Sequence, residues 1–83
     1  MSTNAPTIPA ETARHVLAHF GHGGVLPGRF GVQLITLIAS ADRQTTARLA
    51  EVFPAEAEAV RMAQYDEDGI AKLQAIANGR AAA

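Results

Sequence analysis

A run of twelve uncharged residues, from Phe30 to Ala41, constrains the fold of this chain more than any other feature. At about 100° per residue, Gln33, Thr36 and Ser40 fall on one narrow stripe of a helix. The rest of the circumference carries mainly Phe, Val, Leu and Ile. A helix that is apolar almost all round has to be enclosed by other helices or by a partner chain. The run therefore predicts a central apolar helix over about residues 27–40.

Length and composition favour one small helical domain around that helix. A chain of 83 residues fits a single domain. Eighteen residues are Ala, which favours helix but contributes little burial, and only 22 other side chains are apolar and bulky. No segment alternates with a period of two, as a strand would. We expect a compact all-α fold of four or five short helices, with a light core that would gain from self-association.

Capping residues and apolar spacing predict where the other helices lie. Asp42 and Asp66 are suitable N-caps, and Pro54 can open a helix at its first turn. In the helix that follows Asp42, the side chains expected to face inward are Leu49, Val52 and Phe53. The predicted helices cover about residues 9–20, 43–53, 54–64 and 67–77. Residues 1–7 are predicted to be a disordered lead, residues 8–79 the domain, and residues 80–83 a frayed tail.

Charge and cysteine content exclude several classes of protein. The net charge of −1 provides no general attraction to nucleic acid or to an anionic membrane. The chain has no Cys, so disulfides and thiolate metal sites are excluded. The N-terminus lacks the pattern of a signal peptide, and the uncharged run is shorter than the ~20 residues that span a bilayer. We expect a cytoplasmic protein without membrane association.

Three histidines within eight residues form the one candidate metal site. His15 and His19 have i, i+4 spacing, and His22 follows in a glycine-rich loop. However, His15 and His19 lie opposite the apolar face of their helix, and no carboxylate ligand is evident. Exposed surface histidines are therefore expected, with metal binding as an alternative. No Ser has a credible base beside it, so the sequence predicts neither an enzyme nor a cofactor.

A second alternative is a helix-turn-helix that binds DNA. Residues 42–53 would be the recognition helix, following a short turn after the uncharged run. Ser40 stands where the turn usually has Gly, and basic residues are few elsewhere, so nucleic-acid binding is not favoured. The side chains that would face the bases or phosphates are Arg43, Gln44, Thr45 and Arg48.

The leading interpretation is a non-enzymatic protein that binds another protein or its own copies. The uncharged helix carries more apolar surface than the remaining bulky side chains can easily cover. Any uncovered side would be the binding surface. The candidate partner-binding residues on this helix are Val32, Ile35 and Leu37.

Several short motifs between about residues 20 and 77 carry a resemblance to known proteins. They are Pro27-Gly-x-Phe30, the run Leu34 to Ile38, Ala41-Asp42, Leu49, Phe53-Pro54, and Asp68-Gly-Ile with Leu73. On these residues the chain resembles small, functionally uncharacterised helical proteins of actinobacteria and their phages. The resemblance implies no catalytic residue and no defined activity. It implies a phage or mobile-element accessory factor that binds a host or virion protein, located in the host cytoplasm or the virion.

Overall fold

The helix that begins at Pro54 is rich in Ala, and these small side chains allow it to pack against the four other helices. The computed structural model describes residues 7–79, and these form five helices and no strand. The helices are α1 (Ala10–His19), α2 (Arg29–Ser40), α3 (Arg43–Val52), α4 (Pro54–Tyr65) and α5 (Gly69–Ala77). The radius of gyration is 11.8 Å, as expected for a compact domain of this size. The predicted all-α single domain is confirmed.

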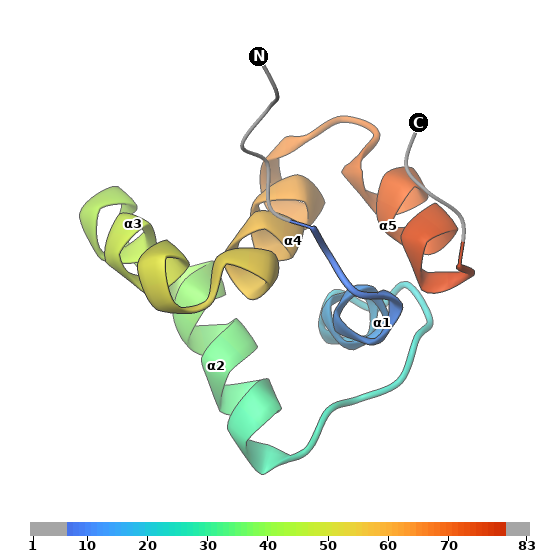
Figure 1. The fold of residues 1–83 in the computed structure, drawn as a ribbon, viewed down its shortest axis with the longest axis horizontal. Helices are drawn as coiled ribbons and strands as arrows, with labels where there is room; N and C mark the ends of the chain where they lie inside the picture. Colours follow the sequence, from blue (N-terminus) through green and yellow to red (C-terminus); the bar gives the residue numbers. More distant parts are fainter. Residues whose placement is uncertain (1–6, 80–83) are drawn as a thin grey trace.

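The helix at the centre is α4, whereas the sequence predicted the helix over residues 27–40. In Figure 1, α4 lies between α3 and α5, and it contacts each of the other four helices. Its buried residues are Ala57, Ala59, Val60 and Met62, and they are spread around the circumference of the helix. The small side chains of Ala57 and Ala59 allow neighbouring backbones to approach, which a count of bulky residues does not reveal.

Helix α2 is covered on one side only. Its buried residues are Leu34, Ile35 and Ile38, and its extensive contacts are with α1 and α4. Gln33, Thr36 and Ser40, the predicted polar stripe, are exposed. The other helices do not enclose α2, which was one of the two expected arrangements, because α3 turns away from α2 and packs on α4 instead. A face of α2 therefore remains open.

Two predictions about helices near the turns also need correction. Val52 was expected to face inward but is 69% exposed. The inward arc of α3 instead runs through Thr46, Leu49 and Ala50 towards Phe53, and Val52 is rotated about 100° from Phe53, outside this arc. Asp66 does not cap α5: it ends α4, and α5 begins three residues later at Gly69. The predicted N-cap Asp42 is confirmed, because its carboxylate accepts a hydrogen bond from the Thr45 backbone N–H.

The ends of the chain are only partly described. Residues 1–6 and 80–83 lie outside the described residues, and so do the predicted frayed tail and nearly all of the predicted disordered lead. Thr7 is exposed and precedes the first helix.

Arg14 of α1 forms a hydrogen bond with the C-terminal end of α5. Its Nη1 donates a hydrogen bond of 2.8 Å to the backbone oxygen of Ala77 in a partly buried position. A guanidinium is favourable there, because the last carbonyls of a helix carry partial negative charge. We expect Arg14→Met to keep the packing of the aliphatic stem and to lose about 1–2 kcal/mol in urea unfolding. The matched control, Arg48→Met on an exposed side chain, should be nearly neutral; equal losses in both variants would contradict this role.

The Asp42 cap should make stability depend on pH in the acidic range. The hydrogen bond from the Thr45 backbone N–H holds the pKa of the Asp42 carboxyl below its ordinary value of 3.8. A lowered pKa in the folded state means that the cap stabilises fully above pH 3.8 and is lost as the pH falls through the lower folded value. Asn is an equally good N-cap but does not titrate. When the pH is lowered from neutral to below 3.8, the melting temperature of Asp42→Asn should therefore fall by less than that of the parent. An identical loss in both proteins would contradict the prediction.

Candidate functional site: the open face of α2

The open face of α2 carries two large apolar side chains in line. Phe30 is 66% exposed and Leu37 is 49% exposed. With Gln33 and Ser40 they occupy positions i, i+3, i+7 and i+10, the spacing that forms a narrow seam along a helix. We call Phe30, Gln33, Leu37 and Ser40 the α2 seam. Neither the seam nor any other position from Phe30 to Ser40 carries a charge.

The polar groups along this side of α2 are largely satisfied inside the helix. The Thr36 hydroxyl donates to the Val32 backbone oxygen at 2.7 Å, and the Ser40 hydroxyl donates to the Thr36 backbone oxygen at 2.8 Å. Covering these hydroxyls with a partner would therefore leave no donor without an acceptor. The side chain that needs a polar partner when the seam is covered is the amide of Gln33.

Phe30 is positioned by a contact with the corner between α3 and α4. The ring centroids of Phe30 and Phe53 lie 6.1 Å apart, and the rings are tilted by 52°. Phe53 is partly buried against the core, so it supports one side of the Phe30 ring and leaves the other side open. The loop before α2 carries two more exposed apolar side chains, Val25 at 59% and Leu26 at 67%. Exposed apolar side chains thus also occur outside the seam.

The three predicted partner-binding residues lie on different sides of α2, two of them exposed and one buried. Leu37 is exposed and belongs to the seam, while Val32 is 38% exposed on the opposite flank of α2. Ile35 is only 2% exposed and belongs to the core, so it is not a partner-binding residue in this fold. Its position on the wheel points towards the side of α2 that α1 and α4 cover. Phe30 and Gln33 share the exposed side of α2 with Leu37 but were not among the predicted residues, although their i, i+3 and i+7 spacing was a signal for them.

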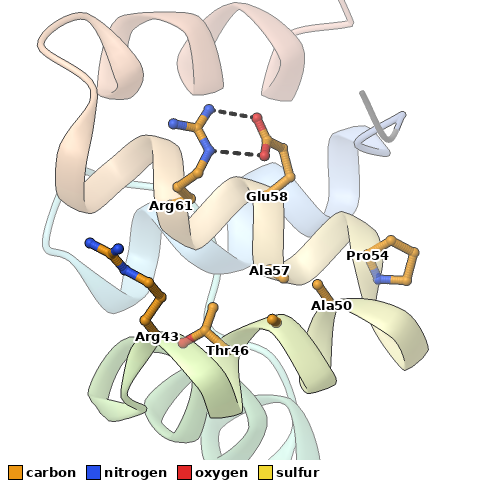
Figure 2. A pocket seen from close by; sticks show the side chains of 8 residues that line it. Arg43, Thr46, Ala50, Pro54, Ala57, Glu58 and Arg61 are labelled. Atoms are coloured by element: carbon orange, nitrogen blue, oxygen red, sulfur yellow. Dashed lines mark hydrogen bonds and ion pairs between the residues drawn. The ribbon is translucent and has the colours of Figure 1, made fainter. Parts of the chain in front are cut away.

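A shallow groove separates α3 from α4 on another side of the molecule. Figure 2 shows Arg43 and Thr46 of α3 facing Ala57, Glu58 and Arg61 of α4 across it, and its volume is about 410 Å³. The Arg61 guanidinium donates to Glu58 Oε2 at 2.7 Å and to Asp66 Oδ1 at 2.9 Å. These hydrogen bonds, first to Glu58 and then to Asp66, raise the pKa of Arg61. Its charge is therefore already neutralised within the protein.

The candidate DNA-contacting residues all lie on exposed positions of α3. Arg43, Gln44, Thr45 and Arg48 are exposed. The Asp42 carboxylate lies at the same end of the helix, where it accepts the hydrogen bond from the Thr45 N–H. A phosphate at that end would meet this negative charge instead of free N–H groups. The structure therefore places the four residues on one exposed helix, without a larger basic surface around them.

The three histidines are not gathered into a metal site. His15 Nε2 lies 3.9 Å from Glu11 Oε2, and the His19 ring packs edge-on against Phe20 with the centroids 4.8 Å apart. His22 is exposed in the loop. His15 and His19 are half-buried, contrary to the expectation that both are exposed. Among residues 7–79, no three His, Asp or Glu side chains lie together as metal ligands would.

Comparisons of this chain with protein-family models, with curated proteins and with solved structures give no match. Across residues 7–79, no helix combines the length and the apolar character needed to cross a membrane.

Proposed function

We propose that this protein is a non-enzymatic helical interaction domain whose α2 seam binds another protein chain. The observation that carries the proposal is the exposure of Phe30 and Leu37 in line on an uncharged helix face. Contiguous exposed apolar surface on a small domain is typical of a binding surface. The resemblance to small proteins of actinobacteria and their phages supports an accessory role in a phage or a mobile element.

The chemistry of the seam also supports this role. A buried interface tolerates polar residues when their hydrogen bonds are made, and the Ser40 and Thr36 hydroxyls already have acceptors inside α2. The core meanwhile closes without the seam, because Leu34, Ile35 and Ile38 anchor α2 from its other side. Phe30 and Leu37 are thus available for binding without loss of the fold.

Photo-crosslinking in the cells that produce the protein tests the proposal. A photoreactive amino acid at Leu37 should yield a covalent adduct with a protein chain, detected as a heavier band on a denaturing gel. The matched control is the same amino acid at Gln74, an exposed position of α5. Adducts at Leu37 and none at Gln74 support the proposal. No adduct at Leu37, or equal adducts at both positions, contradicts it.

DNA binding through Arg43, Gln44, Thr45 and Arg48 is the second candidate. It is supported by the exposure of all four side chains on one helix. Asp42 and Glu51 offset the two arginines, so residues 42–52 carry no net positive charge to attract phosphates. We therefore favour the protein-binding role. Salt-dependent fluorescence anisotropy with mixed DNA fragments tests the alternative, and binding that weakens in Arg43→Ala and Arg48→Ala would support it.

A further inference from the structure

We infer that the chain that covers the α2 seam is a second copy of this protein, with two α2 helices packed antiparallel about a two-fold axis near Gln33. The inference rests on the proposed function, because it names the partner of the same surface. A two-fold interface places each surface against itself, so its chemistry has to be self-complementary. Charge, geometry and hydrogen bonding on α2 each meet that condition.

The first condition is the absence of like charges. Around a two-fold axis, a charged side chain meets its own copy or lies close to it, which costs free energy. From Phe30 to Ser40 no side chain of α2 is charged, on the seam or beside it. The one charged residue of α2 is Arg29 at its first position, outside the seam, whereas each of the other helices carries a charged side chain in its interior. Helix α2 is thus the element of this chain best suited to lie against its own copy.

The second condition is the match of apolar side chains across the axis. Phe30 and Leu37 are separated by seven residues, or about 10.5 Å along the helix. In an antiparallel pair centred near Gln33, Phe30 of one copy lies opposite Leu37 of the other, and the reverse contact forms at the other end. Both exposed side chains are buried by the same symmetric contact. Antiparallel helices also place their dipoles in the favourable relative orientation.

The third condition is the polar group at the centre. Gln33 lies midway between Phe30 and Leu37 on the seam, so it approaches Gln33 of the second copy. A carboxamide has both a donor and an acceptor, so two of them can pair reciprocally. A single polar residue in an otherwise apolar helix contact fixes register and orientation at some cost in stability. Gln33 would therefore set the alignment of the two copies.

The size of the seam sets the strength of association. Helix α2 has 12 residues and is about 18 Å long. Two such helices bury less than the roughly 1,200 Å² of a standard stable interface. The expected dimer is therefore weak, with a dissociation constant of roughly micromolar to hundreds of micromolar.

Sedimentation equilibrium of the full chain with opposite charges at Gln33 tests the inference. The parent protein should dimerise reversibly with concentration. Gln33→Glu and Gln33→Lys should each weaken dimerisation at least about tenfold, because like charges meet at the axis. An equimolar mixture of the two variants should recover association, because opposite charges then meet. The matched controls, Gln74→Glu and Gln74→Lys on exposed α5, should dimerise like the parent, and circular dichroism should show all variants folded.

Each result supports or overturns the inference. Loss in the single variants and recovery in the mixture support it. A parent that stays monomeric at the highest soluble concentration overturns it, as does a dimer that neither charge affects. Loss without recovery overturns the position of Gln33 at the axis. If the parent is monomeric while Leu37 crosslinks to a different protein, the dimer is wrong and the proposed function stands. If Leu37 crosslinks to nothing, the proposed function fails as well.

Discussion

Gly69→Ala should destabilise the domain by about 3 kcal/mol, although the same change in an ordinary helix stabilises by up to about 1 kcal/mol. Gly69 is buried and is the first residue of α5. A Cβ built there would collide with the backbone oxygen of Met62 on the central helix α4. Because a backbone atom cannot move aside as a side-chain end can, α5 would have to shift away from α4. Such a loss is a large part of the total stability of a small domain.

Chemical unfolding monitored by circular dichroism measures this effect. Gly28→Ser is the matched control, because nothing lies within 4 Å of a Cβ at Gly28 and its φ of −69° suits any residue. Ser is also a good N-cap for α2, so this variant should be neutral or slightly more stable. A Gly69→Ala variant as stable as the parent would show that α5 does not pack on α4 as closely as described.

Ala59→Leu should cost about 2–3 kcal/mol by overpacking the centre of the domain. Ala59 is fully buried on α4, which contacts each of the other four helices. Extra methylene groups at this position have to displace a neighbouring helix. Leu and Ala both favour helix, so helix propensity explains little of such a loss.

Ala71→Leu is the control for this second prediction. Ala71 is exposed on α5, so the larger side chain meets solvent there. We expect the free energy of unfolding of the control to lie within about 0.5 kcal/mol of that of the parent. If Ala59→Leu is equally well tolerated, α4 is not the centre of the packing.

The fold class could be predicted from the sequence because helix signals are local. Asp42 as a cap, Pro54 in a first turn and the apolar spacing of α1 each act within one helix, and the structure agrees with them. The central helix could not be predicted in the same way. Helix α4 contains Glu58, Arg61 and several alanines, so its pattern is typical of a surface helix. Its central place depends on close helix approach, which is a property of the assembled domain.

The candidate site was predictable in part. The uncharged run indicated that α2 carries more apolar surface than the domain can bury, and Leu37 is indeed exposed. Which apolar residues stay outside depends on where α1 and α4 lie around α2. Ile35 and Leu37 have similar side chains, yet one is 2% and the other 49% exposed. The position of Asp66 was missed for a related reason, because its carboxylate binds Arg61 of α4 instead of capping α5.

The most direct test of the account compares charged substitutions at two adjacent residues of α2, Leu37→Asp and Ile38→Asp. Leu37 is 49% exposed and lies on the open seam, whereas Ile38 is 2% exposed and lies in the core. Thermal unfolding by circular dichroism should show a cooperative transition for Leu37→Asp, with a loss of only about 1 kcal/mol from helix propensity and the helix dipole. Ile38→Asp, which buries an unpaired charge, should not fold. Loss of the cooperative transition in Leu37→Asp as well would contradict the account, because it would mean that α2 is enclosed and has no open seam.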